Sequence, residues 1–268
     1  MTQDADFEQN ERVRERFTRT ADAFAQMAVP PRAVEAEKIA DLAQAQPQDV
    51  GLDLACGPGT FTTALARRAR RVLGVDLTPA FLHLARKRAD AQGLGNIRLL
   101  CGDATALPLP DESIDVAICG YSFHHMREPL RALRELARLV RRGGRLAVVD
   151  IYTPDGFDPE AGDRVERARD NSHRRTFTRE DFLETVERAG FAVRATENLE
   201  RSRRFGDWMR IAGWKPDDPA WRESRRLMEG HLSNDKTGFQ PRLLLAAPEA
   251  EPEIQFTQRS LFLGATKS

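Results

Sequence analysis

The sequence predicts an α/β fold in which a parallel sheet is covered on both faces by helices. Short apolar strands alternate with amphipathic helices between residues 50 and 151. Right-handed crossover connections place such helices on both faces of a sheet. The chain of 268 residues, with 41% hydrophobic side chains, is long enough to bury a large core without disulfides or a metal ion.

Two helices are expected before the sheet. Apolar residues at helical spacing, including Phe17 and Phe24, predict a first helix that ends before Pro30, and a second helix is expected at residues 32–45. The expected strands of the alternating region are residues 50–55, 72–75, 97–100, 114–119 and 145–151, and its expected helices are residues 61–68, 80–92 and 130–140.

Proline, glycine and capping residues mark the ends of the later elements. Pro129 suits the first turn of its helix, and Gly143 is expected to end that helix. Thr178 and Asp181 have the spacing of a capping box, which predicts another helix before a strand at residues 191–196.

The last third of the chain departs from this alternation. Residues 201–250 are expected to form a mostly helical insertion over the edge of the sheet, before a last strand at residues 254–265. The insertion holds all three tryptophans of the chain, Trp208, Trp214 and Trp221.

Charge and composition exclude several classes of protein. Lys plus Arg and Asp plus Glu each number 41, so the net charge is zero and a general polyanion binder is not expected. No apolar run is long enough to span a membrane, and residues 1–11 lack the pattern of a secretory signal. Cys56, Cys101 and Cys119 form no CxxC pair. We therefore expect a cytoplasmic protein with no membrane span and no nucleic-acid partner.

A glycine-containing turn follows the first expected strand. Gly57 and Gly59 allow the backbone to approach a ligand closely, and the next helix presents free N–H groups. Asp76 ends the second strand, where a carboxylate can accept hydrogen bonds from both ribose hydroxyls. The alternative is that Asp76 caps the next helix, a role for which Thr78 competes. With Asp103 at the end of the third strand, these groups outline a nucleoside-shaped site.

Several segments of the sequence resemble the successive motifs of class I S-adenosylmethionine-dependent methyltransferases. They are DLACGPGT, GVDLT, GDATALPLPDESIDVAIC, the HH pair and LVRRGGRLAVVD, and the resemblance covers residues 48–152. Within that superfamily the sequence is most similar to the ubiquinone and menaquinone C-methyltransferases, which act on small molecules. The resemblance implies a Rossmann-like three-layer sandwich with a mixed seven-stranded sheet whose last strand is antiparallel. It also implies S-adenosyl-L-methionine as the cofactor.

The pattern of the sequence further suggests a division of the chain into three parts. They are an N-terminal helical lid at residues 1–47, a methyltransferase core at residues 48–200 and 251–268, and an inserted helical substrate cap at residues 201–250. Phe17 and Phe24 of the lid and Trp208 and Met209 of the cap are candidate substrate contacts. Packing in a core is the alternative explanation of these apolar residues.

The resemblance assigns ten residues to the cofactor. They are Asp53, Gly57 and Gly59 around the methionine part, Asp76 at the ribose, Asp103 and Ala104 at the adenine, Cys119 and Gly120 beside the sulfonium, and Ala55 and Leu77 as further cofactor contacts. The family often has glycine at position 55, where the methyl group of Ala55 is expected to narrow the turn only slightly. Asp150 is followed by Ile151 and not by asparagine, so no divalent metal site is expected.

Two other enzyme classes share some of these features. A nicotinamide dehydrogenase needs a third glycine where Thr62 stands, and neither Tyr121 nor Tyr152 has a lysine four residues later. Methyltransferases that act on nucleic-acid bases carry a Pro-Pro-aromatic turn after the fourth strand, where residues 120–123 are Gly-Tyr-Ser-Phe. A catalytically silent cofactor-binding protein on the same fold stays open as an alternative.

Histidines and one tyrosine are the candidate catalytic groups. His124 and His125 follow the fourth strand, but in an extended chain they point in opposite directions, so at most one is expected to face the pocket as a base. His173 and Arg174 either hold an anionic or enolic oxygen of the acceptor or belong to a solvated loop. Tyr121 either bonds a substrate oxygen or lines the rim.

The expected acceptor is a small, at least partly apolar molecule that is methylated at carbon, oxygen or nitrogen. Arg201, Arg203 and Arg204 are expected to carry surface charge and not to form an anion site. The sequence leaves the oligomeric state open.

Overall fold

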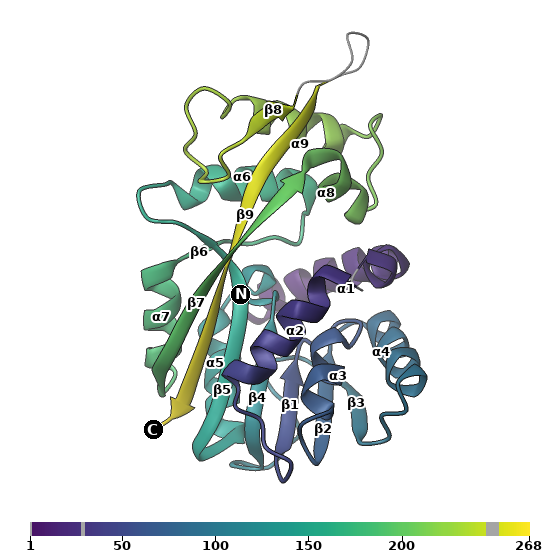
Figure 1. Cartoon of the computed structure of the whole chain (residues 1–268), viewed down its shortest axis with the longest axis vertical. Helices are drawn as coiled ribbons and strands as arrows, with labels where there is room; N and C mark the ends of the chain where they lie inside the picture. Colours follow the sequence, from purple (N-terminus) through teal and green to yellow (C-terminus); the bar gives the residue numbers. More distant parts are fainter. Residues whose placement is uncertain (1, 28–29, 245–251) are drawn as a thin grey trace.

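The sheet at the centre of the protein has seven strands in the order β3-β2-β1-β4-β5-β9-β7, with two short strands paired to its members (Figure 1). This arrangement comes from a computed structural model that describes residues 2–27, 30–244 and 252–268. The strands are β1 (Val50–Leu54), β2 (Arg71–Asp76), β3 (Ile97–Cys101), β4 (Ile114–Gly120), β5 (Val140–Thr153), β6 (Phe177–Thr178), β7 (Phe191–Arg204), β8 (Arg242–Leu244) and β9 (Glu253–Lys267).

The direction of β9 makes the sheet mixed. The strands from β1 to β5 pair in parallel, whereas β9 runs antiparallel to both of its neighbours, β5 and β7. The short strand β6 extends the sheet beside β5, and β8 pairs with β9. The expected seven-stranded sheet with an antiparallel last strand is confirmed.

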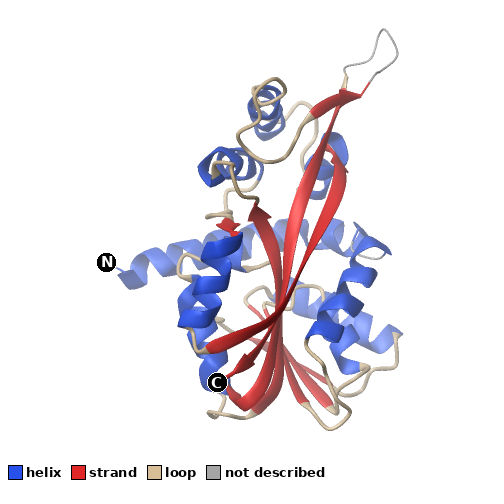
Figure 2. Cartoon of the chain, turned by 60° about the vertical axis from the view of Figure 1, so that its left-hand side comes forward, coloured by secondary structure: helices blue, strands red, loops and turns tan. Residues whose placement is uncertain are grey.

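Helices cover both faces of the sheet, which gives the expected three layers (Figure 2). One face is covered by α5 and α7, and the other by α2, α3 and α4, and each set buries its own apolar cluster against the strands. The helices are α1 (Thr2–Met27), α2 (Pro30–Leu42), α3 (Thr60–Ala66), α4 (Pro79–Ala91), α5 (Pro129–Leu139), α6 (Pro159–Arg169), α7 (Arg179–Arg188), α8 (Phe205–Ile211) and α9 (Pro219–Glu229), with a 3-10 turn η1 (Phe123–His125).

A separate apolar cluster forms the cap above the core. Phe205 and Trp208 of α8, Trp221 of α9 and Phe256 of β9 are buried together, and Val165 of α6 packs against them. The helix α6 was not predicted, because most of its residues are charged and few are apolar. The cap therefore draws on residues before β7 as well as on the insertion.

Two strands, β5 and β7, extend much further than expected. The prediction that the strand after α7 ends at residue 196 is wrong, because β7 continues to Arg204 and pairs with β9 along its length. Charged and polar residues fill this extension, so the apolar pattern that signals a strand is missing there. The expectation that Gly143 ends α5 is also wrong, since α5 ends at Leu139 and β5 begins at Val140.

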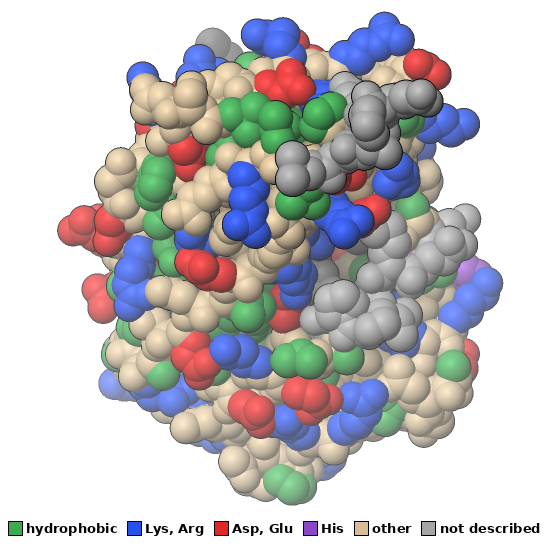
Figure 3. Space-filling view, turned by 45° about the horizontal axis from the view of Figure 1, so that its top comes forward, with side chains coloured by type: hydrophobic (Ala, Val, Ile, Leu, Met, Phe, Trp, Pro, Cys, Tyr) green, Lys and Arg blue, Asp and Glu red, His purple; other side chains and the backbone are tan. Residues whose placement is uncertain are grey.

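The helix α1 lies between the core and the cap. It contacts α4 of the core and α8 of the cap, so it covers the edge of the sheet where the parallel strands end. No helix in the described ranges is both long and apolar enough to cross a membrane. Basic and acidic side chains alternate over the face seen in Figure 3, in keeping with the zero net charge.

The capping box at the start of α7 offers a test of the fold. The Thr178 hydroxyl accepts a hydrogen bond from the Asp181 amide at 3.1 Å, as predicted. We expect Thr178→Ala to lower the free energy of unfolding by about 1 kcal/mol in urea denaturation. Thr185→Ala is the control, because the Thr185 hydroxyl bonds only a carbonyl of its own helix. Equal losses in both variants would contradict the capping role.

Candidate active site

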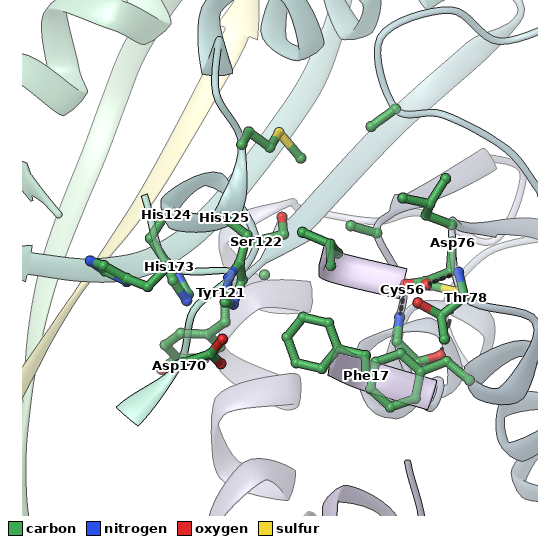
Figure 4. A pocket seen from close by; sticks show the side chains of 18 of the residues that line it. Phe17, Cys56, Asp76, Thr78, Tyr121, Ser122, His124, His125, Asp170 and His173 are labelled. Atoms are coloured by element: carbon green, nitrogen blue, oxygen red, sulfur yellow. Dashed lines mark hydrogen bonds between the residues drawn. The ribbon is translucent and has the colours of Figure 1, made fainter. Parts of the chain in front are cut away.

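A cavity of about 290 Å³ lies where the carboxyl ends of β1, β2 and β4 meet α1 and the cap. Figure 4 shows three histidines and Asp170 on one side of it, and Asp76, Cys56 and Thr78 on the other, with Phe17 of α1 between the two groups. The cavity therefore has one end at the glycine turn and another at the histidines.

The turn between β1 and α3 contains three residues with a left-handed backbone. The φ angle is 55° at Ala55, 52° at Gly57 and 79° at Gly59. A Cβ atom on Gly59 would lie 2.8 Å from the Cβ of Ala85, so this glycine also permits close packing of α4. The left-handed conformation costs an L-residue such as Ala55 about 1–2 kcal/mol. The alanine at position 55 was expected only to narrow the turn slightly, but its left-handed backbone also strains the turn.

The Asp76 carboxylate joins two of the loops at this end of the cavity. Its Oδ2 atom accepts a hydrogen bond from the Gly57 amide and its Oδ1 atom one from the Thr78 amide, both at 2.8 Å. Burial raises the pKa of Asp76, and the two amides oppose that effect. Thr78, the competing cap, makes no capping bond with its side chain. Two carboxylate oxygens offer about four acceptor positions, so a ribose diol still finds acceptors here.

Asp103 is also a hydrogen-bond acceptor in the cavity wall. Its Oδ1 atom accepts from the amide and the hydroxyl of Thr105, both at 2.8 Å, and its Oδ2 atom accepts from Asn10 Nδ2 at 2.8 Å. Gln9, the neighbouring residue of α1, donates to the carbonyl oxygens of His125 and Ser172 at 2.8 and 2.7 Å. The helix α1 thus bonds to loops at both ends of the cavity, and nothing in the local sequence of Gln9 and Asn10 signalled this role.

Most of the residues expected at the site line the cavity. They are Phe17, Ala55, Gly57, Asp76, Leu77, Asp103, Ala104, Gly120, Tyr121, His124, His125, His173 and Trp208. The side chain of Phe24 lies outside the described part of the structure.

Five of the expected residues do not line the cavity. Gly59 lies against α4, and Cys119 is buried with its sulfur 2.9 Å from the Ser122 hydroxyl. Met209 is buried in the apolar cluster of the cap, and Arg174 is exposed to solvent. The fifth residue is Asp53, which lies beneath the turn.

Asp53 is fully buried, with 0% of its surface exposed. Its Oδ2 atom accepts a hydrogen bond from the Thr62 hydroxyl at 2.6 Å, and its Oδ1 atom has no partner among the described residues. Burial raises the pKa of Asp53 to about 7, and the negative charge of Asp76 adds to the shift.

Two arginines lie at the cavity against expectation. Arg201 and Arg203 line its wall, whereas Arg204 is exposed. Arg201 pairs with Glu35 of α2, and Arg203 donates to the Gln258 side chain from two nitrogens, at 3.1 and 3.3 Å. The expectation of surface charge is wrong for these two residues because the unforeseen extension of β7 carries them to the cavity.

The three histidines form one cluster. The expectation that at most one of His124 and His125 faces the pocket is wrong, because both belong to the 3-10 turn η1 and not to an extended segment. Their ring centroids are 4.1 Å apart, and the ring of His173 lies 5.5 Å from that of His124. The ring of Phe17 meets His125 edge-on at 5.0 Å.

Each histidine of the cluster is connected to a buried aspartate. His124 Nδ1 bonds to Asp150 Oδ1, and His173 Nε2 lies 2.7 Å from Asp163 Oδ1. His125 Nδ1 lies 3.1 Å from the Ser172 hydroxyl. Ser172 in turn donates that hydroxyl to Asp170 Oδ1 at 2.6 Å.

The pKa values of the two neighbouring histidines are shifted in opposite directions. Burial lowers the pKa of His124, but the charge and hydrogen bond of Asp150 outweigh it, and the net pKa is raised. Burial and the adjacent His124 lower the pKa of His125 well below its ordinary value. Despite burial, the pKa of Asp170 is lowered, and the positive charges of Arg16 and Arg169 contribute to that shift.

Comparison with known proteins identifies the family. A family profile described as "Methyltransferase domain" matches residues 52–148. The uncharacterized protein YafE of Escherichia coli is 31% identical over 152 residues, which cover 56% of this chain and 73% of YafE. The chain belongs to the class I S-adenosylmethionine-dependent methyltransferases. The expected enzyme class and its cofactor are therefore confirmed.

Other methyltransferases are similar over parts of the chain. YcgJ of Bacillus subtilis is 29% identical over 188 residues, covering 69% of this chain and 72% of YcgJ. The solved structure of YcgJ is similar to this protein with a TM-score of 0.75 and 23% identity. The alignment covers 88% of this chain and 99% of YcgJ. A demethylmenaquinone methyltransferase of Thermus thermophilus is 40% identical over 105 residues, or 38% of this chain. The chain matches 47% of the length of that relative.

The glycine-turn end of this methyltransferase fits S-adenosylmethionine. A Cβ atom built on Gly57 has only Phe81 Cδ2 near it, at 4.0 Å, so the backbone there is open to a ligand. The carboxylates of Asp76 and Asp103 can accept hydrogen bonds from hydroxyl and amino groups. Leu77 and Phe81 supply apolar surface for the adenine ring.

The titration of Asp53 leads to a pH-dependence test. Between about pH 4 and pH 7, Asp53 holds a proton in the folded protein but is ionised in the unfolded chain, so its burial destabilises the protein increasingly as pH rises. Asp53→Asn removes this proton uptake. We expect the free energy of unfolding of the variant, relative to wild type, to rise by up to about 1.4 kcal/mol per pH unit in that window.

Urea denaturation at several pH values measures this difference. Asp41→Asn is the control, because the Asp41 side chain is 69% exposed. A difference between Asp53→Asn and wild type that does not change with pH would show that Asp53 is ionised in the fold.

Proposed function

We propose that this methyltransferase transfers the methyl group of S-adenosylmethionine to a small, partly apolar molecule, with the cofactor at the glycine-turn end of the cavity. The observation that carries the proposal is the Asp76 carboxylate, which faces the cavity between the amides of Gly57 and Thr78. Asp103 lies beside it at the end of the neighbouring strand β3, at a position suited to the adenine of the cofactor. Parallel strand ends are where α/β proteins bind nucleotides.

The residue assignments follow from this placement. Asp76 would hold the ribose, Leu77, Asp103 and Ala104 the adenine, and Gly120 the region of the sulfur. Asn10 occupies one oxygen of Asp103, so adenine either shares that oxygen or displaces Asn10. Asp53 does not line the cavity, so it would influence the methionine part of the cofactor only through the turn at Gly57.

The other end of the cavity would receive the acceptor. Phe17, Tyr121, Trp208 and Ile211 supply apolar surface, and polar groups are interspersed among them. Enclosure by α1 and the cap favours a small molecule over a polymer. The quinone-related names of several relatives support the same choice of acceptor, as does the name of a geranyl diphosphate C-methyltransferase from Streptomyces coelicolor, whose fold is similar at 16% identity and a TM-score of 0.60.

The chain's own contribution to the reaction would be alignment and exclusion of water. When bound, S-adenosylmethionine supplies an electrophilic methyl group on a sulfonium. Apolar side chains of α1 and the cap hold the acceptor in line with that methyl group and keep the site dry. The candidate bases, His124, His125 and His173, lie at the acceptor end.

Calorimetry with two ligands tests the ribose assignment. We expect the wild type to bind 2′-deoxy S-adenosylhomocysteine about tenfold more weakly than S-adenosylhomocysteine, because one hydrogen bond to Asp76 is lost. Asp76→Asn should bind both ligands with similar, weakened affinity. Asp90→Asn, whose side chain is 66% exposed, should behave like the wild type. Full discrimination by Asp76→Asn would contradict the assignment.

A labelling experiment tests the acceptor class. The protein is incubated with methyl-labelled S-adenosylmethionine and a small-molecule extract of its source cells, and the labelled products are identified by mass. We expect label in a small, partly apolar product. Label only in protein or nucleic acid would contradict the proposal, and so would no label in any product.

A further inference from the structure

His124 and His125 present two different nitrogen environments to the same cavity. The rings are adjacent, with centroids 4.1 Å apart, yet each uses its Nδ1 atom in a different way. His124 bonds to a carboxylate, and His125 bonds to a hydroxyl. In neither ring does Nε2 have a hydrogen bond to another described residue, so each ring keeps one nitrogen available for a ligand.

The surroundings of His124 favour its charged form. Asp150 is fully buried and accepts from both the backbone amide and the Nδ1 atom of His124. A buried carboxylate beside an imidazole stabilises the imidazolium. In that form His124 Nε2 carries a hydrogen and can donate it.

Hydrogen bonds determine which nitrogen of His125 carries the hydrogen when the ring is neutral. The Ser172 hydroxyl has a single hydrogen, and it donates this hydrogen to Asp170 Oδ1 at 2.6 Å. It can therefore only accept from His125, so His125 Nδ1 carries a hydrogen. In the neutral ring the lone pair is then on Nε2. Asp170 is held as an anion by the Ser172 amide at 2.9 Å and by Arg16, whose Nε atom lies 3.4 Å from its Oδ2 atom.

The charged groups around His125 come from several elements. Positive or potentially positive groups are His124 of η1, His173, Arg169 of α6 and Arg16 of α1; negative groups are Asp150 of β5, Glu166 of α6 and Asp170. The positive charge on the adjacent His124 opposes a second one on His125, and burial acts in the same direction. The lowered pKa of His125 favours the neutral ring, whose hydrogen the hydrogen bonds place on Nδ1.

We propose that His125 is the general base of this enzyme, that Ser172 and Asp170 position it, and that the acceptor carries an acidic hydroxyl of the phenol or enol class. This inference rests on the proposed function. His125 Nε2 accepts the hydroxyl proton while an electron pair of the acceptor forms the bond to the methyl carbon, and the carbon–sulfur bond breaks with its pair on sulfur. The products are the methylated acceptor, S-adenosylhomocysteine and protonated His125, so charge and atoms balance. His124 donates to the acceptor oxygen as negative charge develops on it.

Nuclear magnetic resonance of isotope-labelled histidine tests the two nitrogen environments without an acceptor. The chain has five histidines, so the ring signals can be assigned by single substitutions. At neutral pH we expect His125 to be neutral with its hydrogen on Nδ1, and as the pH falls we expect His124 to become charged before His125. A charged His125 at neutral pH, or a hydrogen on its Nε2 atom, would overturn the inference.

The positioning role of Ser172 has its own spectroscopic test. Ser172→Ala removes the acceptor of the Nδ1 hydrogen, so a substantial fraction of His125 should change to the Nε2-protonated tautomer. Ser224→Ala is a matched control, because Ser224 of α9 is as fully buried as Ser172 but belongs to the cap. It should leave the His125 signals unchanged. An unchanged tautomer in Ser172→Ala would show that Ser172 does not position the ring.

Calorimetry with S-adenosylhomocysteine separates this inference from the proposed function. Ser172→Ala should bind the ligand within about twofold of wild type, because Ser172 does not line the cavity. Failure of the wild type to bind would overturn the proposed cofactor site, whatever the tautomer. Normal binding with a charged His125 would overturn only the assignment of the base and of the acceptor class.

Discussion

The Asp76 carboxylate holds the cofactor end of the cavity together. It accepts hydrogen bonds from Gly57 and Thr78, and so connects the loop after β1 with the loop after β2. Burial raises its pKa, and the two amides make the buried charge less costly. The proposed contact with a ribose uses the same two oxygens. The loop geometry and the proposed ribose contact therefore depend on one side chain.

Enclosure of the cavity depends on contacts between distant parts of the chain. Gln9 and Asn10 connect α1 to the loops after β4 and β3, while the long strands β7 and β9 carry the cap above the core. The resulting burial strengthens electrostatic interactions around the histidines. A buried carboxylate raises the pKa of His124, whereas burial and the adjacent His124 lower the pKa of His125, so two neighbouring rings differ in their preference for a proton.

Local signals in the sequence predicted much of the fold and the glycine-turn end of the cavity. The turn at Gly57, the strand-end residue Asp76 and the capping box at Thr178 each lie within a few residues of the structure they determine. The acceptor end was less predictable. The pairing of Ser172 with His125 joins residues 47 positions apart, and the arginines of β7 reach the cavity only because a polar strand pairs with β9. The turn at His124 was missed because no proline or glycine marks it.

A crystal structure of the complex with S-adenosylhomocysteine tests the central claim most directly. We expect both ribose hydroxyls within hydrogen-bonding distance of Asp76, the adenine beside Leu77 and Asp103, and the sulfur near Gly120 with the histidine cluster beyond it. A ribose bound by other residues, or a nucleoside outside this cavity, would contradict the proposed cofactor site.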